Sequence, residues 1–323
     1  MQRVDLSIVI PALDEEKSIS ELHLLITKSL DKKKINYEII FVDDGSKDST
    51  WNEIEKIINY NKNVKGIKFK KNYGKSDALD AAFKNSSGDF ILTMDADLQD
   101  DPYEIYKLLE IIKNKKFDLV SGWKKKRNDP LGKTIPSKFF NYVTRVFSGI
   151  NLNDFNCGIK IYRREVIESI DLYGEMHRYI PLIAKWNGYN FIGEKVVNHN
   201  KRKFGKTKFG MERFVRGFLD LLSVSFVYRF KHRPMHFFGS LGVLFFLVGF
   251  VSVGLITYEK ISKISQNIPL DLIRPVTDQP LFYVALVSII IGVQLFLVGF
   301  LSELIIQINS DKKRYKIDKT KNV

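Results

Sequence analysis

Two long runs without a charged side chain constrain the fold of this 323-residue chain more than any other feature. Residues 235–258 and 281–301 contain no Asp, Glu, Lys or Arg, and a transmembrane helix needs about 20 mostly apolar residues. A buried helix of a soluble domain is the alternative for either run alone. Two such runs in one chain favour a membrane hairpin at 234–308, with helices at about 235–258 and 281–303.

Basic residues flank the two runs on one side of this hairpin. Arg229, Lys231 and Arg233 precede the first run, and the tail at 309–323 is rich in lysine, whereas the loop between the runs is near neutral. The positive-inside rule therefore places both termini in the cytoplasm. The N-terminal apolar run is too short for a secretory signal. We expect an integral, multi-pass membrane protein whose soluble part is cytoplasmic.

The soluble part alternates short apolar runs, rich in β-branched residues, with helical patterns. This alternation predicts a doubly wound α/β layer with a mostly parallel, Rossmann-like sheet. Ligands of such sheets bind at the carboxyl ends of the strands. The predicted strands are 6–12, 37–45, 64–70, 89–97 and 117–123, and the predicted helices are 18–30, 49–59 and 76–84.

Acidic residues follow two of the predicted strands. Asp43 and Asp44 end one strand, and Asp95 and Asp97 follow another, with Gln99 at the same spacing. Surface acids two residues apart are common, but two diacids at strand ends are not. Carboxylate and amide oxygens are the ligands that Mg²⁺ and Mn²⁺ prefer, and substrate phosphates usually complete the shell. The pattern indicates a divalent metal site.

The chain carries a formal net charge of +14, which favours anionic partners. Its basic residues concentrate at 124–133 and 199–218. The second stretch leads into an amphipathic pattern at 211–233, in which Phe214, Phe218 and Leu221 share one helical face. Next to a membrane hairpin this pattern favours a helix in the headgroup region, and an ordinary core-facing helix is the alternative.

Several motifs together carry a family resemblance. They are DDGSKDST (43–50), NYGKSDALDAAF (72–83), DADLQDDP (95–102) and NCGIKIYRREV (156–166). The chain resembles the family 2 glycosyltransferases of GT-A fold, in the polyprenyl-phosphate branch of dolichol-phosphate mannose synthase and the bacterial undecaprenyl-phosphate glycosyltransferases. The QxxRW motif of processive polysaccharide synthases is absent from the sequence. The resemblance implies a GT-A catalytic domain at 1–210, amphipathic juxtamembrane helices at 211–233, the hairpin, and a basic cytoplasmic tail, in a bacterial inner membrane.

The resemblance also implies roles for single residues. The donor nucleotide-sugar would be bound by Pro11, Leu13, Glu15, Asp43, Asp44 and Lys75, and the metal by Asp95, Asp97 and Gln99. The acceptor phosphate would be bound by Lys133, Ser137, Arg202, Lys206 and Lys208. The catalytic residues would be Asp95, Asp97 and Asp154, although the aspartate that some relatives carry in a GDF turn aligns with Gly158 rather than with Asp154.

These roles imply an inverting transfer of a sugar from a UDP- or GDP-sugar to a polyprenyl phosphate. A divalent metal would stabilise the charge that develops on the leaving phosphate. A phosphate acceptor is already anionic at pH 7, because its second pKa is about 6, and therefore needs no strong base. A hydroxyl acceptor, in a glycolipid or polysaccharide, is the alternative and would need a general base.

A third hypothesis is a non-catalytic protein that binds anions or membranes. Such a protein has no need of the acidic residues at the strand ends. We expect a nucleotide-sugar, a polyprenyl phosphate and the lipid bilayer as partners, and no nucleic acid. The sequence leaves open the sugar, the nucleotide and the polyprenyl chain. It allows a homo-oligomer but fixes no number of subunits.

Overall fold

The computed structural model describes most of the chain. Described are residues 4–33, 35–125, 131–172, 174–201, 203, 220, 221, 223, 224, 226, 230, 233–269 and 272–308, except for the side chains of 32, 131–139 and 306–308. Contacts divide the chain into two units, 1–225 and 226–323. Most of the predicted amphipathic segment at 211–233, and the whole tail at 309–323, lie outside the described residues.

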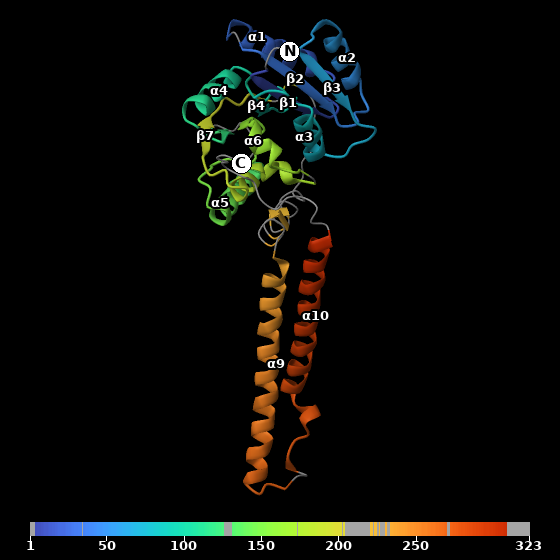
Figure 1. Cartoon of the computed structure of the whole chain (residues 1–323), viewed down its shortest axis with the longest axis vertical. Coiled ribbons are helices and arrows are strands. Elements are labelled where there is room, and N and C mark those ends of the chain that lie inside the picture. The colour runs from blue at the N-terminus through green and yellow to red at the C-terminus, as the bar shows by residue number, and fades with distance from the viewer. Residues whose placement is uncertain are drawn as a thin grey trace, which may run out of the picture. The chain divides into compact units, whose positions relative to one another are not determined.

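The first unit is built on one sheet, shown in Figure 1 from blue to yellow-green. Its described strands lie in the order β3-β2-β1-β4-β6-β5-β7. The strands are β1 (Leu6–Ala12), β2 (Tyr37–Asp43), β3 (Val64–Lys68), β4 (Phe90–Thr93), β5 (Leu119–Trp123), β6 (Lys160–Arg163) and β7 (Ile192–Val196). Neighbours pair in parallel, except that β6 runs antiparallel to both β4 and β5. The sheet is therefore mostly parallel, as predicted.

Helices cover both faces of this sheet. Ile8 and Ile10 of β1 belong to a core that α1, α2 and α4 complete, whereas Val9 between them points to the other face, because strand side chains alternate. There α3 contacts β1 and β2. The described helices of this unit are α1 (Ile19–Leu30), η1 (Asp31–Lys33), α2 (Thr50–Tyr60), α3 (Lys75–Lys84), α4 (Glu104–Asn114), α5 (Leu131–Ser148), α6 (Arg164–Glu168), η2 (Met176–Arg178) and α7 (Ile180–Trp186).

The predicted strand at 89–97 is longer than the observed one. β4 ends at Thr93, so Asp95 and Asp97 lie on the turn that follows the strand. Leu98 in this turn has a φ of 62°, a left-handed conformation that bends the chain back and that a strand cannot contain. The predicted helix at 76–84 begins one residue earlier, at Lys75.

The second unit is a helical hairpin, drawn in orange and red in Figure 1. It consists of α9 (Pro234–Ser265), η4 (Val276–Asp278) and α10 (Pro280–Ile308). The two long helices have mean hydropathies of 2.3 and 2.7. Only 28% and 22% of the residues in their most apolar segments are buried. A core helix of a soluble domain is mostly buried, and these two helices are not, while their length and composition fit membrane spans.

Glycines bring α9 and α10 close together. A Cβ on Gly242 would lie 3.0 Å from the carbonyl oxygen of Gly292, and one on Gly249 would lie 2.6 Å from Ile289 Cγ1. Such backbone-to-backbone packing is typical of helices that associate in lipid, where small residues replace hydrophobic burial as the basis of contact. At the start of α9, the ring of Phe226 lies 5.0 Å from that of Phe237.

Candidate active site

The carboxyl ends of β1, β2 and β4 meet at one edge of the sheet. Asp43 lies in register with Ala12, and Asp44 donates its backbone N–H to the Ala12 carbonyl at 2.9 Å. On the other side of β1, the N–H of Met94 donates to the Val9 carbonyl at 3.1 Å. The parallel pairing therefore gathers the acidic residues that follow β2 and β4 at this edge, as the sequence predicted.

Asp44 ties the end of β2 to the start of α3. Its carboxylate accepts the backbone N–H of Tyr73 at 2.7 Å and that of Gly74 at 3.0 Å. Gly45 permits this approach, because it has a φ of 73° and a Cβ there would lie 2.6 Å from the Asn72 nitrogen. Burial raises the pKa of Asp44 despite these donors. Asp43 is fully buried and accepts the Ser46 N–H at 2.8 Å.

The other predicted donor-binding residues lie on the segment that leaves β1. Pro11, Leu13 and Glu15 are half-buried there. The backbone N–H of Glu15 donates to Thr50 Oγ1 at 2.8 Å, and its carboxylate accepts the hydroxyl of Ser18 at 2.8 Å. This segment therefore packs against the start of α2, next to the end of β2.

Asp95 lies between two lysines. Its Oδ1 forms an ion pair with Lys75 Nζ, and the Asp95 side chain is still 33% exposed. Burial alone would raise the pKa of Asp95, but the ammonium groups of Lys75 and Lys124 hold it well below its usual range. Asp95 is therefore a carboxylate anion at neutral pH, open to solvent at the strand edge.

Asp97 and Gln99 share the turn after β4. The Oδ1 of Asp97 accepts the backbone N–H of Gln99 at 3.1 Å, and Asp97 is 9% exposed. The Gln99 carbonyl in turn accepts the N–H of Asn200 at 2.8 Å. Residues 199–200, which begin the second basic stretch, thus lie beside this turn.

Asp100 and Lys124 form a buried ion pair that the sequence did not single out. Lys124 Nζ lies 2.9 Å from Asp100 Oδ1, and their side chains are 13% and 0% exposed. Burial would lower the pKa of Lys124, but the carboxylates of Asp100 and Asp95 raise it above its usual range. Both signals were visible, because Asp100 ends the DADLQD motif and Lys124 begins the first basic stretch. Their pairing is tertiary and left no pattern in the sequence.

Strand β6 brings further residues to this edge. Gly158, just before β6, packs on the acids: a Cβ there would lie 2.7 Å from Asp95 Cγ and 3.0 Å from Asp100 Oδ2. Lys160 is buried and donates to the Cys157 carbonyl, and burial lowers the pKa of its ammonium group. Burial raises the pKa of Cys157 to about 12, so its thiol is protonated at neutral pH.

Asp154 lies in a turn that β7 anchors. Glu194 accepts the backbone N–H groups of Asn153 and Asp154 at 2.7 and 3.0 Å. The Asp154 side chain is 1% exposed, and its Oδ1 accepts the N–H of Asn156 at 3.1 Å. These contacts hold Asp154 in a buried, hydrogen-bonded turn that is anchored to β7. Its predicted catalytic role stays a prediction.

His177 is a further residue near the acids, and its sequence context does not single it out as a general base. Its backbone N–H donates to Ser76 Oγ at 3.0 Å, and its Nδ1 lies 3.1 Å from the same hydroxyl. Ser76 is fully buried on the first turn of α3. Residues 74 to 76 thus contact three other parts of the site in succession: Asp44, Asp95 and His177.

The predicted acceptor residues are only partly described. Lys133 and Ser137 lie on the first turns of α5, and nothing is described of their side chains. Arg202, Lys206 and Lys208 lie outside the described residues. Their roles stay predictions.

The strand-end acids at this edge carry the oxygen atoms that a divalent cation prefers as ligands. Among the described residues, no three His, Cys, Asp or Glu side chains gather closely enough to hold a metal ion. The predicted metal ligands are two carboxylates and one amide, Asp95, Asp97 and Gln99, and their role stays a prediction. The Lys75 ammonium group pairs with Asp95 Oδ1 and shows that this oxygen accepts a cation.

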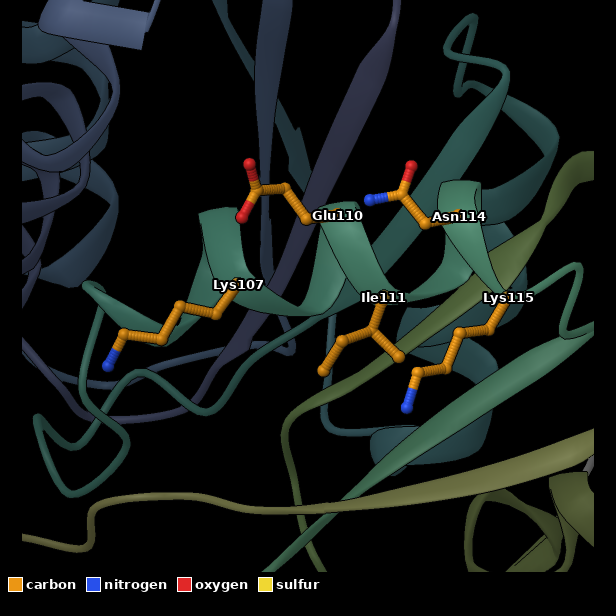
Figure 2. Close-up of a pocket in the computed structure, with 5 residues that line it drawn as sticks. All are labelled: Lys107, Glu110, Ile111, Asn114 and Lys115. Carbon is orange, nitrogen blue, oxygen red and sulfur yellow. The ribbon is translucent and has the colours of Figure 1, made fainter.

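A shallow hollow elsewhere has a different character. Figure 2 shows it on α4, where Lys107, Ile111 and Lys115 point to one side and Glu110 and Asn114 to the other. It shares no residue with the strand-end acids and brings no polar groups together around a common point. We do not assign it to the donor.

Comparison with known proteins identifies the family. The model of glycosyl transferase family 2 matches residues 7–171, which include the strand-end acids and β6. The chain belongs to this family. It is therefore a glycosyltransferase, and the predicted GT-A fold is confirmed.

Two relatives show how far the similarity extends. A dodecaprenyl-phosphate galacturonate synthase of Rhizobium johnstonii is 35% identical over 308 residues, 94% of this chain and 88% of that protein. An undecaprenyl-phosphate 4-deoxy-4-formamido-L-arabinose transferase of Shewanella sediminis is 34% identical over 225 residues, 69% of this chain and 67% of that protein. The first similarity extends into the hairpin.

Solved structures of more distant proteins share the fold. Glucosyl-3-phosphoglycerate synthase from Mycobacterium tuberculosis, in complex with Mn²⁺ and UDP-glucose, matches with a TM-score of 0.52 and 19% identity, over 70% of this chain and 79% of that one. Mannosyl-3-phosphoglycerate synthase from Rubrobacter xylanophilus matches with a TM-score of 0.55 and 16% identity, over 68% and 73%. At these identities the likeness concerns the fold.

Proposed function

We propose that this family 2 glycosyltransferase moves a sugar from a nucleotide-sugar to a polyprenyl phosphate, with inversion at the sugar carbon. The observation that carries the proposal is the 35% identity, over 94% of the chain, to a dodecaprenyl-phosphate galacturonate synthase. A second relative acts on undecaprenyl phosphate. The two relatives transfer different sugars, so the shared chemistry is that of the polyprenyl phosphate.

The donor would bind at the carboxyl edge of β1, β2 and β4. Pro11, Leu13, Glu15, Asp43 and Asp44 would bind the nucleoside, and Lys75 the diphosphate. Asp95, Asp97 and Gln99 would hold Mg²⁺ or Mn²⁺, which when bound supplies positive charge to the leaving diphosphate. A structural neighbour that was crystallised with Mn²⁺ and UDP-glucose supports dependence on a divalent metal.

The protein's own charges would govern the transfer. Lys124 is held by buried Asp100, so its charge stays fixed beside Asp95 while the leaving group develops negative charge. An acceptor phosphate needs cations to hold it close to an anionic donor, and Lys133, Ser137, Arg202, Lys206 and Lys208 would supply them. No strong base is required, because the acceptor oxygen is already charged.

The hairpin would hold this site at the cytoplasmic face of a bacterial inner membrane. α9 and α10 have the length and composition of membrane helices, and the basic flanks support a cytoplasmic position for both termini. A long polyprenyl chain would remain in the bilayer while its phosphate reaches the site.

The test is direct transfer by the full chain. Detergent-solubilised protein, Mn²⁺ and a short polyprenyl phosphate are incubated with radiolabelled UDP- and GDP-linked hexoses, hexuronates and pentoses, and organic extraction recovers any glycolipid. We expect one donor to label the lipid. An Asp97→Asn variant should lose the product, whereas Asp80→Asn, on the outer face of α3, should keep it. Failure of every donor with folded protein would contradict the proposal.

A further inference from the structure

Two ammonium groups act on Asp95, and their settings differ. Lys75 pairs with Asp95 Oδ1, and both of these side chains are 33% exposed. Lys124 also acts electrostatically on Asp95 but is paired with Asp100, whose side chain is 0% exposed. The site thus contains one cation held at the solvent edge and one held from behind by a buried carboxylate.

These settings make the two lysines unequally exchangeable. An ion pair that water still reaches contributes little to stability, so breaking it costs little. Removing Lys124 from Asp100 would instead leave a buried carboxylate uncompensated, which is strongly unfavourable. A second cation that arrives at Asp95 would therefore displace Lys75 and leave Lys124 in place.

The backbone around Lys75 is fixed, so that the displacement concerns the side chain alone. Gly74, with a φ of 103°, donates its N–H to Asp44 at 3.0 Å. Ser76 on the other side is fully buried and accepts the N–H of His177 at 3.0 Å. Lysine has a flexible stem of four carbons. Its ammonium group can move to a new anion while α3 stays in place.

We propose that Lys75 is an exchangeable counter-ion of Asp95, which holds this carboxylate until a divalent cation replaces it and then binds the donor diphosphate. The inference rests on the proposed metal and donor sites and adds an order to them. A cation and the Lys75 ammonium group compete for Asp95 Oδ1. A diphosphate gives the displaced ammonium group a new partner and removes this competition.

The exchange couples the two ligands. The metal alone must displace Lys75 into water, whereas the metal with a nucleoside diphosphate displaces it onto an anion. Each ligand therefore raises the affinity of the other by the same factor, as thermodynamic linkage requires. Part of this coupling factor arises from the Lys75 ammonium group, so a substitution that removes its charge should reduce the factor.

The test measures Mn²⁺ binding, without turnover. Full-length protein in detergent is titrated with Mn²⁺, and free Mn²⁺ is measured by electron paramagnetic resonance, alone and with UDP, with a parallel series in GDP. Lys75→Met removes the charge. Lys84→Met is the matched control, because Lys84 lies at the other end of α3 and pairs with Asp80 at 2.5 Å on the surface. Lys75→Arg keeps the charge.

Without nucleotide, Lys75→Met should bind Mn²⁺ about five-fold more tightly than the parent, the lower end of typical coupling factors. Adding UDP or GDP should raise the Mn²⁺ affinity of both proteins. The increase for Lys75→Met should be about five-fold smaller than the increase for the parent. Lys84→Met should match the parent, and Lys75→Arg, which keeps the charge, should gain less Mn²⁺ affinity than Lys75→Met. Lys75→Gln carries the same expectations and replaces the Met variant if that variant does not fold.

Unchanged or weaker Mn²⁺ binding by Lys75→Met without nucleotide would overturn the exchange, and Lys75 would then merely support Asp95. In that case the parent would still bind Mn²⁺ and label the lipid, so the proposed function would stand. If the parent neither binds Mn²⁺, with or without nucleotide, nor transfers sugar, both proposals fail.

Discussion

Gly158 packs so closely on Asp95 that a Cβ on Gly158 would overlap the Asp95 carboxylate. A Cβ on Gly158 would lie 2.7 Å from Asp95 Cγ, and the backbone of β6, which begins at Lys160, fixes its position. The carboxylate would have to move away from its place beside Lys75. The closeness of these two residues therefore sets where a cation can bind.

Gly158→Ala should consequently reduce sugar transfer by about a hundred-fold or more, because a shift of about 1 Å at a reacting centre costs that much. Initial rates of glycolipid formation measure the loss. Gly254→Ala is the control, since Gly254 has no atoms within 4 Å of its Cβ position. Equal rates for the two variants would show that Asp95 does not need its present position.

Metal removal should abolish transfer by the parent protein. Chelation by EDTA should stop glycolipid formation, and Mn²⁺ or Mg²⁺ in excess should restore it. Asp95→Asn and Asp97→Asn should each lower kcat by about 10² to 10³, the usual loss when one stabilising group is removed from an active site. Full activity in EDTA would contradict a metal at these residues.

Lys124→Met should destabilise the first unit by about 3–5 kcal/mol, because it leaves Asp100 buried and unpaired. Lys125→Met should change stability little, since Lys125 lies over the Trp123 ring at 5.5 Å, where exposed contacts are weak. Thermal unfolding followed by tryptophan fluorescence compares them. Adding Asp100→Asn to Lys124→Met should recover part of the loss, and a simple sum of two losses would exclude the pairing.

Glu38 should make stability depend on pH. Burial would raise its pKa, but Lys65 at 2.6 Å, Ser7 and Ser87 outweigh burial and hold the pKa below the usual 4.5. The carboxylate therefore stabilises the fold above pH 4.5, and this contribution is lost as the pH falls through the lowered pKa. Glu38→Gln should unfold more easily at pH 7, by about 1–3 kcal/mol, and the difference should shrink in acid. A difference independent of pH would exclude this account.

Gly242→Leu should separate the two hairpin helices. Gly242 lies against the Gly292 carbonyl, and overpacking costs about 1–3 kcal/mol. Circular dichroism in detergent should show unfolding at a lower temperature than in the parent. Gly254→Leu, on the same helix with open space around it, should unfold like the parent. If both variants lose the same stability, the contact between Gly242 and Gly292 is not the cause.

The sequence predicted those parts of the fold that local patterns determine. β1 is an apolar run apart from Ser7, and its predicted bounds of 6–12 agree with the structure. Strand β6 was not predicted, because it is short and carries Lys160 and Arg163 at its ends. It is a strand because β4 and β5 pair with it on both sides, which is a tertiary reason.

Some residues of the candidate site were also predictable from local patterns, and others were not. Asp43 and Asp95 were predicted at one edge because parallel strands bring their carboxyl ends together. Two contacts of the site join residues that lie far apart in the chain: Lys124 with Asp100, and His177 with Ser76. No local sequence pattern predicts such contacts. The roles of the acceptor residues and of Asp154 stay predictions.

The position of β6 between β4 and β5 also affects how the protein is made. β6 follows both of its neighbours, β4 and β5, in the chain. The sheet around Asp95 is therefore incomplete until β6 has left the ribosome. β7, at the far edge, still precedes α9. Since N-terminal parts generally fold first during synthesis, the sheet of the first unit can form before α9 and α10 have been synthesised.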